Sequence, residues 1–489
     1  MRYVNSKFDA LLLAGAALIV FFLLGPLLTI PLRIPLSYNE GWNAYFCARA
    51  VNSRLGPLYP SADTLVFNNY PPLSFYVVGA FGRYVAGDLI TAGRIVALAS
   101  LLASAALLGT CVRLLGGSLR GSMAAAMLLL LYTGTFYRDY VAVDDPQWLG
   151  HALMLGGLAV LLGGYRAGHY PAGRIVAATM LIGAGGFVKH SLVGLPIAVT
   201  IWLFLVQPRA AMIWLVSATA WVGTGLIATD ILQGHAAFAD ILGHHRVFRA
   251  RRAVKAVERL APLLPLMIIA GFSYRERIHR VPLQSSRPMQ FAALFAVISL
   301  AAGLTQRMGE GVNYNAYFET MIALCLTMGL TVDTLRSVGG RAVGPATMIG
   351  FAAIPLLVMM PWQLQHAWGD IVGRQARARS WQPVIAQLAA APRLVACETL
   401  SLCFWAGKPF EVDMFNLNQS ILTGGDIVRF DTLARIHSFS RFEFATIYAS
   451  TNGPPAMKHD LLLENLLGHG YAIAATGPEG SVLLAPPMP

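Results

Sequence analysis

Several carboxylates and a lysine lie in short polar segments of an otherwise apolar sequence. Side chains of these types could catalyse the transfer of a chemical group. Glu40 lies among aromatic and amide side chains, Asp144 and Asp145 are adjacent, and Lys189 is followed by His190. A carboxylate can accept the proton of an attacking hydroxyl or amine, and a cation can stabilise a departing phosphate. These residues are therefore candidates for the base and the phosphate-binding groups of a transferase.

Each candidate also has a purely structural interpretation. Glu40 can be a helix-start carboxylate that the helix dipole favours. One of Asp144 and Asp145 can cap a helix that opens at Pro146, and Lys189 can extend its ammonium toward the membrane surface. The two aspartates, with Glu40 as a further oxygen ligand, can also hold a divalent metal ion such as Mg²⁺ or Mn²⁺. The residues alone leave these alternatives open.

Residues 240–259 are rich in arginine, and their apolar positions recur at helical spacing. This pattern predicts an amphipathic helix on the membrane surface. Its basic face, which includes Arg246, Arg249 and Arg252, is expected to bind anionic lipid headgroups or the phosphate of a lipid-linked donor.

Residues 309–315 form another polar segment, rich in glycine and amide side chains. Asn313 and Tyr314 are candidates for hydrogen bonds to a sugar or a phosphate. The same composition is also typical of a simple turn.

The composition indicates a membrane protein. Of 489 residues, 56% are hydrophobic and 12% are charged, whereas soluble domains carry about a quarter charged residues. The net charge of +12 lies mostly in short segments between apolar runs. This is the pattern of cytoplasmic membrane loops, so we expect no nucleic-acid partner. The first apolar run, 9–32, is long enough to be a span rather than a cleaved signal.

The length needed to cross a bilayer predicts about eleven transmembrane helices within residues 1–361. The expected spans are 9–32, 89–112, 121–138, 146–163, 174–188, 191–206, 210–232, 259–273, 289–306, 316–332 and 343–361. Alternate loops are basic, which puts the N-terminus in the cytoplasm and Glu40, Asp145 and Lys189 on the opposite face. Within the first outer loop, 33–88, a short apolar stretch at 73–82 is expected to lie on the membrane surface.

From residue 362 to 489 the composition changes to that of a small α/β domain, closed by a hairpin over 471–485. With an odd number of spans before it, this domain is expected outside the cytoplasm. Cys397 and Cys403 can pair there if the compartment is oxidising, or stay as buried thiols.

Five segments in order carry a family resemblance. They are the acid after the first span, N-N-Y-P-P-L at 68–73, D-D-P at 144–146, F-V-K-H at 187–190 and G-E-G-V-N-Y at 309–314. Together they resemble the GT-C glycosyltransferases of the protein O-mannosyltransferase and aminoarabinose-transferase type. The resemblance implies a polyprenyl-phosphate sugar donor and inversion at the anomeric carbon. It also implies that Glu40 is a base or metal ligand and that Asp144 or Asp145 is the acid of the second outer loop.

The chain departs from that pattern at three positions. The aminoarabinose transferases have a lysine where this chain has Tyr70, and an acid where it has Asn69; the mannosyltransferases have Asp-Glu where it has Asn39-Glu40. Phosphate binding is therefore expected to shift to Lys189, His190 or the basic helix, with Tyr70 a substrate-binding candidate.

We accordingly expect an inverting glycosyltransferase of the bacterial inner membrane whose active site faces the periplasm. Its acceptor is a glycolipid, a polysaccharide or a protein, and membrane lipids are its other partners. The alternative is a transporter or flippase of a lipid-linked sugar. Transporters place charged or broken segments near mid-membrane, usually in repeated halves, and neither feature is evident in the sequence.

Overall fold

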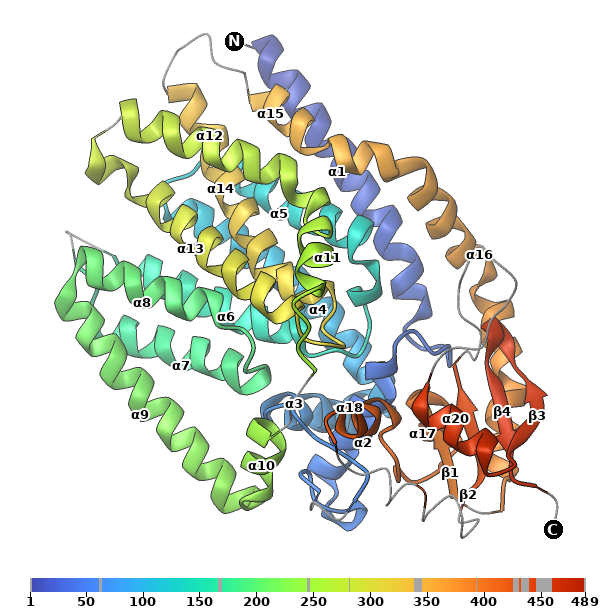
Figure 1. The fold of residues 1–489 in the computed structure, drawn as a ribbon. Coiled ribbons are helices and arrows are strands. Elements are labelled where there is room, and N and C mark those ends of the chain that lie inside the picture. Colours follow the sequence, from blue (N-terminus) through green and yellow to red (C-terminus); the bar gives the residue numbers. More distant parts are fainter. Residues whose placement is uncertain are drawn as a thin grey trace.

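The computed structural model shows a bundle of long helices with a small sheet domain at one end (Figure 1). It describes residues 2–60, 64–165, 169–243, 247–280, 282–337, 345–392, 394–424, 431, 439–445 and 460–487. The bundle has its own apolar core, and so does the sheet domain. A third core joins the first loop to the start of the sheet domain.

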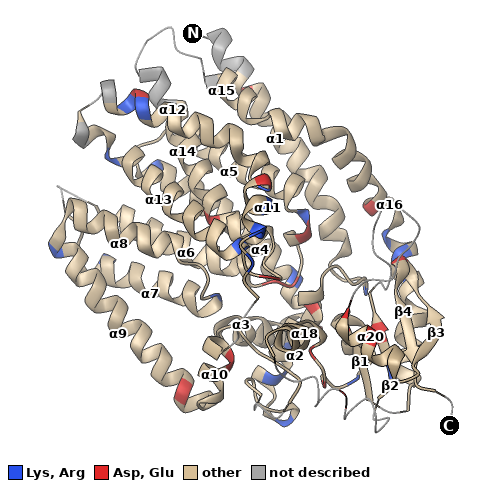
Figure 2. Ribbon diagram, in the orientation of Figure 1, with Lys and Arg blue, Asp and Glu red and all other residues tan. Residues whose placement is uncertain are grey.

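Six helices of the described part are long and apolar enough to cross a membrane. They lie within α1 (Arg2–Thr29), α4 (Leu89–Leu114), α5 (Leu119–Phe136), α9 (Pro208–Gln233), α13 (Leu283–Arg307) and α14 (Phe318–Ser337). A seventh candidate is the pair α15 (Pro345–Ala352) and α16 (Ile354–Ala390), bent by 53°. Charged residues are sparse along these helices and gather mainly near their ends (Figure 2).

The remaining helices of the bundle are shorter. They are α6 (Gln147–Gly163), α7 (Ala172–Val188), α8 (Gly194–Val206) and α12 (Leu264–Arg280). Every predicted span falls largely on a helix, and a multi-pass membrane protein is confirmed. The number eleven is not confirmed, because these four helices have 13 to 17 residues, fewer than the ~20 that usually cross the hydrocarbon core.

Glycines bring α6 and α7 into close contact. A Cβ atom at Gly185 of α7 would lie 2.9 Å from the Gly150 carbonyl oxygen of α6, and one at Gly157 would lie 2.8 Å from the Ala178 oxygen. Small residues allow backbones to approach in this way inside membranes. The pairing matters for the site, since α6 begins just after Asp145 and α7 ends just before Lys189.

The first loop contains the short helices α2 (Tyr38–Val51), η1 (Ser53–Leu55), α3 (Leu73–Phe81) and η2 (Gly82–Ala86). Ser37 caps α2, since its Oγ accepts a hydrogen bond from the Asn39 N–H at 3.3 Å. This is ordinary N-terminal capping chemistry. It begins a helix at Tyr38 and thereby sets the directions of Asn39, Glu40 and Trp42.

The single amphipathic helix predicted over 240–259 is wrong. Two short helices occur there instead, α10 (Ala236–Gly243) and α11 (Arg252–Glu258), and residues 247–251 between them are not helical, with Phe248 paired to Gly309 in an isolated β-bridge. The Arg249 N–H donates to the Met308 oxygen at 3.2 Å, and the Glu310 N–H donates to the Val247 oxygen at 2.9 Å. These long-range backbone bonds satisfy the polar groups that a continuous helix would otherwise pair locally. Arg246 lies outside the described residues.

The C-terminal region is a small α/β unit, as predicted. Its sheet has the order β1-β2-β4-β3, with β1 parallel to β2 and the other pairs antiparallel. The strands are β1 (Leu394–Cys397), β2 (Phe439–Phe444), β3 (Ala472–Thr476) and β4 (Val482–Ala485). Its helices are α17 (Leu400–Trp405), α18 (Met414–Leu422) and α20 (Leu461–Gly468). The predicted closing hairpin is β3 and β4, joined through η6 (Pro478–Gly480).

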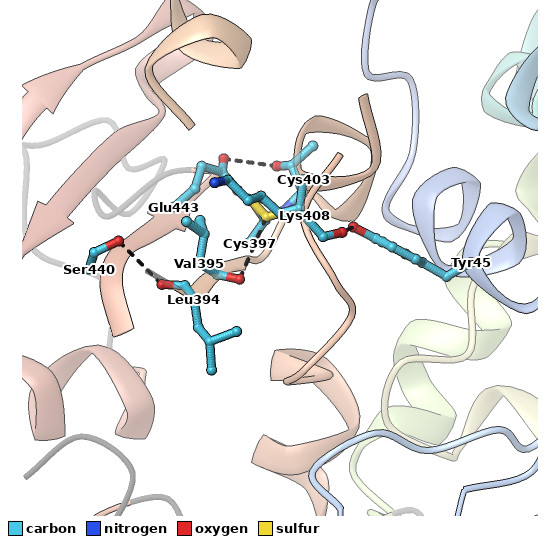
Figure 3. The surroundings of a disulfide bond; sticks show 9 residues. Tyr45, Leu394, Val395, Cys397, Cys403, Lys408, Ser440 and Glu443 are labelled. Carbon is cyan, nitrogen blue, oxygen red and sulfur yellow. Dashed lines mark hydrogen bonds between the residues drawn. A yellow bond between two sulfur atoms is a disulfide. The ribbon is translucent and has the colours of Figure 1, made fainter. Parts of the chain in front are cut away.

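A disulfide ties β1 to α17 where this unit docks on the first loop (Figure 3). Cys397 and Cys403 form the bond, so of the two alternatives for these cysteines the paired one holds. Beside it, the Tyr45 hydroxyl donates to the Lys408 oxygen at 2.7 Å (Figure 3), and Lys408 Nζ donates to the Ala391 oxygen at 2.6 Å. The C-terminal unit thus holds helix α2 in place.

Gly41 of α2 makes this docking close enough. A Cβ atom there would lie 2.0 Å from the Ser401 nitrogen of α17. We expect Gly41→Ala to lower the free energy of unfolding by about 1–3 kcal/mol, because the added methyl group meets backbone rather than a flexible side chain. Gly223→Ala on α9 is the control, since no atom of the described residues lies within 4 Å of its Cβ position. Thermal unfolding in detergent measures both, and equal unfolding temperatures for the two variants would contradict the close contact.

Candidate active site

A cavity of about 640 Å³ opens where the loops at one end of the bundle meet. The first loop, the segment after α7, the loop between α13 and α14, and helix α18 all contribute to its wall. Four of the predicted site residues line it: Tyr70, Lys189, His190 and Asn313. The loops that the sequence placed on one face of the membrane are therefore close in space.

Asp145 lies directly behind this wall. Its carboxylate accepts a hydrogen bond from Asn39 Nδ2 at 2.8 Å and another from the Gln147 N–H at 2.9 Å. Lys189 Nζ lies 3.7 Å from the same carboxylate. Asn39, Gln147 and Lys189 all line the cavity, and Asp145 is 5% exposed. The ion pair stands at the edge of a space large enough for a sugar.

Lys189 is also stacked on Tyr70. Its Nζ lies 5.1 Å from the centre of the Tyr70 ring, within the range of a cation–π contact. Tyr70 occupies the position where the aminoarabinose transferases have a lysine, so here the cation reaches the wall from the end of α7. His190, next to it, is exposed and lines the same cavity. Both of these expected phosphate-binding residues therefore line the cavity.

Glu40 does not line the cavity, and its carboxylate is completely buried. Arg94 of α4 donates to both of its oxygens, with Nε at 2.7 Å and Nη2 at 2.8 Å. The same guanidinium donates to four backbone oxygens at the end of α1: those of Thr29, Ile30, Leu32 and Ile34. These hydrogen bonds tie α1, α2 and α4 together, so the ion pair has the geometry expected of a structural contact.

Asp144 is buried too, at 2% exposure, and packs on α4 at Gly93. A Cβ atom at Gly93 would lie 2.0 Å from the Asp144 carboxyl carbon, so a glycine is required there. Burial, and then the nearby Glu40 and Asp145 carboxylates, raise the pKa of Asp144 well above its usual range. A carboxyl that favours its protonated form in a closed space is poorly suited to act as a base beside Asp145.

The basic segment, residues 247–259 in the described part of the chain, contacts the loop at 308–310, and none of its described arginines lines the cavity. Arg249 pairs with Glu310 at 3.4 Å, and Arg252 Nη1 donates to the Gly309 oxygen at 2.8 Å. The guanidinium groups of Arg259 and Arg307 lie 5.0 and 5.5 Å from the centre of the Tyr314 ring. The predicted residues of this region thus shape the loop, while Asn313 is the one that faces the cavity.

The acidic residues do not fit a divalent metal. Among the described residues, no group of three histidine, cysteine, aspartate or glutamate side chains is arranged to hold one. Both Glu40 oxygens bond to Arg94, and the Lys189 ammonium lies beside the Asp145 carboxylate, where a metal would have to compete with it. We therefore derive no step through a metal ion.

Two charged residues of the site lie inside predicted spans and were not singled out from the sequence. Arg94 is one. Glu319 of α14 is the other: it lines the cavity and accepts the N–H groups of Gly194 and Leu195 at 3.0 and 2.8 Å. It thereby caps α8. A lone charge in an apolar run is costly without a partner, and this signal was present in the sequence at both positions.

No protein-family model and no curated protein matches the chain by sequence. Solved structures do match in fold. ArnT from Cupriavidus metallidurans, in the apo state, superposes with a TM-score of 0.62 at 13% identity, over 99% of this chain and 98% of that one. The same protein bound to undecaprenyl phosphate gives 0.60 at 13% identity, over 98% and 97%.

The archaeal oligosaccharyltransferase AglB from Archaeoglobus fulgidus, in complex with an inhibitory peptide and a dolichol phosphate, also matches. Its TM-score is 0.56 at 11% identity, over 91% of this chain and 70% of that one. ArnT and AglB are both members of the GT-C superfamily. The chain therefore has the GT-C fold, as the ordered motifs indicated.

Proposed function

We propose that this protein is an inverting glycosyltransferase that moves a sugar from a polyprenyl phosphate to an acceptor. The observation that carries the proposal is the pair formed by Lys189, which lines the cavity, and Asp145, which lies behind that wall at 3.7 Å from the lysine. A base and a phosphate-binding cation are the two groups that the reaction needs. The GT-C fold, shared with a structure that holds undecaprenyl phosphate, supports this substrate class.

In the proposed reaction, Asp145 is the base and Lys189 binds the phosphate. The acceptor oxygen or nitrogen attacks the anomeric carbon from the face opposite the phosphate, and its proton passes to the Asp145 carboxylate. Because the base and the phosphate then lie on opposite sides of the sugar, Lys189 must turn away from Asp145 when the donor binds. The bond from the anomeric carbon to the phosphate oxygen breaks, and that oxygen keeps the electron pair. Polyprenyl phosphate leaves with its charge opposite Lys189. Asn39 and Gln147 hold the carboxylate in place through the hydrogen bonds described above.

We further propose that residues 362–489 lie in the periplasm and that residues 1–361 form the transferase domain in the inner membrane. A disulfide between Cys397 and Cys403 suits an oxidising compartment. The basic residues of the alternate loops favour a cytoplasmic N-terminus. The helix α16 contains the proposed boundary and continues into the C-terminal unit without a break. The boundary therefore marks where the chain leaves the membrane, and it does not coincide with the end of a helix.

The test of the function is transfer of labelled sugar from polyprenyl phosphates carrying different sugars, using membranes that contain the protein. Transfer that depends on the protein supports the proposal. If purified protein neither transfers sugar nor binds any polyprenyl phosphate, the proposal fails.

Lys189→Met tests the phosphate site. The substitution keeps the apolar stem and removes the charge, so we expect the Kd for undecaprenyl phosphate to rise about 10- to 100-fold, the range of one hydrogen bond to a charged group. Lys255→Met on α11 is the matched control, since that lysine is exposed and does not line the cavity. Equal affinities of the Lys189 variant and the wild type would show that Lys189 does not bind the phosphate.

A further inference from the structure

A second cavity, of about 810 Å³, lies between helices of the bundle. Helices α8, α12, α13 and α14, which are neighbours in the bundle (Figure 1), form its wall, and most of the side chains that line it are apolar. On α13 the wall runs from Arg287 to Leu300, which is ~20 Å at the helical rise of about 1.5 Å per residue. One leaflet of the hydrocarbon core is about 15 Å thick. This interhelical cavity is therefore long enough for one chain of a membrane lipid.

The two ends of the interhelical cavity differ. One end lies close to the candidate active site, since Thr320 lines the interhelical cavity and the preceding residue, Glu319, lines the active-site cavity. The other end lies at the turn between α12 and α13, where Tyr274 and Arg287 belong to the wall. Among the described residues of this wall, Arg287 is the only one with a charge. The cation thus lies at the end far from the candidate active site.

Arg287 has no carboxylate partner within the described part of the chain, and its side chain is half-buried. Two other arginines near helix ends are bonded within the protein. Arg120 pairs with Asp9 at 2.8 Å, and Arg277 Nη2 donates to the Ser285 oxygen at 2.9 Å. A half-buried guanidinium beside an apolar cavity suits a lipid phosphate, because basic pockets between transmembrane helices bind anionic head groups.

The apolar part of the wall has free space on the α12 side. Gly271 lines it, and no atom of the described residues lies within 4 Å of the Cβ position at this glycine. On the α8 side the wall includes Trp202, which is 7% exposed and whose ring centre lies 5.7 Å from that of Phe291. Within a membrane, an acyl chain gains contacts with such a wall but no transfer from water. Chains of different lipids therefore fit alike, and selection among lipids is expected to come from the head group.

We propose that the interhelical cavity binds an anionic phospholipid, with one acyl chain along α13 and the head-group phosphate at Arg287. The cation and the apolar wall together match an anionic lipid, whereas a zwitterionic lipid carries its own cation beside the phosphate. The proposed function places the donor phosphate elsewhere, at Lys189 in the active-site cavity. Phospholipid binding is independent of that function, since it involves neither a sugar nor transfer. Under the topology proposed above, the lipid belongs to the cytoplasmic leaflet, which is rich in anionic lipids.

The experiment compares the wild type, Arg287→Gln and Arg209→Gln as full chains in detergent. Arg209 is exposed at the start of α9 and does not line the interhelical cavity, so its variant is the control for the loss of one charge. Phosphatidylglycerol and phosphatidylcholine with photoreactive acyl chains are titrated, and the labelled residues are identified by mass spectrometry. We expect the wild type to bind phosphatidylglycerol about five- to tenfold more tightly, the effect of one basic residue near an anionic lipid.

The labels are expected on α12 and α13. Arg287→Gln should abolish the preference for phosphatidylglycerol, and Arg209→Gln should keep it. Equal affinities of the wild type for the two lipids, equal effects of the two substitutions, or labels spread evenly over the bundle would refute the proposal.

Gly271→Phe tests the position of the acyl chain, because the added ring would fill the free part of the cavity. Gly223→Phe on α9 is the control, since no atom of the described residues lies within 4 Å of its Cβ position and it does not line the cavity. We expect only Gly271→Phe to reduce labelling by both lipids. Unchanged labelling in that variant would contradict the position of the chain.

Undecaprenyl phosphate is the competing occupant of this cavity. If it displaces phosphatidylglycerol from the labelled residues, and if Arg287→Gln weakens its own binding, the cavity belongs to the donor lipid and the phospholipid site is refuted. If it binds the wild type and Arg287→Gln equally and leaves the phosphatidylglycerol labels in place, the two lipids have separate sites, as proposed. A wild type that binds phosphatidylglycerol at Arg287 but no polyprenyl phosphate would refute the proposed function and keep the phospholipid site.

Discussion

Asp145→Asn is expected to lower the rate of sugar transfer by about 10²- to 10⁴-fold, the usual contribution of a positioned general base. The amide keeps the size of the side chain and can still meet Asn39 and Gln147, but it cannot accept the acceptor's proton. Binding of undecaprenyl phosphate should not weaken, because Lys189 remains and loses the carboxylate that competes with the phosphate for its ammonium group. The substitution is therefore expected to lower the turnover rate without weakening donor binding.

The measurement is single-turnover transfer of labelled sugar, with donor Kd determined on the same preparation. Asp139→Asn is the matched control, since Asp139 stands in the same loop and is exposed. It should keep full activity. Normal turnover in Asp145→Asn would show that another group takes the proton, and His190, which lines the cavity, would be the next residue to test.

Local patterns were enough to predict much of the fold. Long apolar runs indicated the helices, and the alternation of basic and polar loops indicated which loops share one face. That face is where Lys189, Asp145 and Tyr70 meet. The prediction succeeded because each loop of a membrane helix bundle must lie at one of the two ends of the bundle. The side chains that a loop residue contacts at that end have to be predicted separately.

Partners that come from distant parts of the chain could not be predicted. Glu40 looked like a base because its neighbours in sequence are polar, yet its actual partner is Arg94, 54 residues away. Asp413 carries no local signal that ties it to Tyr38 and Trp42, some 370 residues earlier in the chain, yet its carboxylate accepts a hydrogen bond from each of them. Residues 247–249 are likewise non-helical because their backbone pairs with residues 308–310. Long-range pairing overrode the helical periodicity at that position.

Glu40→Gln is expected to act on stability first. The neutral amide leaves the Arg94 guanidinium buried with its charge uncompensated, and removing one partner of a buried ion pair typically costs about 3–5 kcal/mol. We expect the detergent-solubilised variant to unfold at a clearly lower temperature than the wild type, by a margin larger than that of Asp145→Asn. Replacing Arg94 by methionine should be at least as harmful, because four backbone oxygens at the end of α1 would also lose their donor.

The same variant decides between a structural Glu40 and the base that the family resemblance implies. Transfer must be expressed per folded molecule, with the folded fraction taken from size-exclusion chromatography at a temperature well below unfolding. A structural Glu40 predicts that this normalised rate falls by less than about tenfold, since Asp145 and Lys189 keep their places at the cavity wall. An unchanged unfolding temperature together with a loss of about 10² or more in rate would assign the proton transfer to Glu40. The ion pair with Arg94 would then have to open during each turnover, because both carboxylate oxygens are bonded to Arg94 in the structure described here.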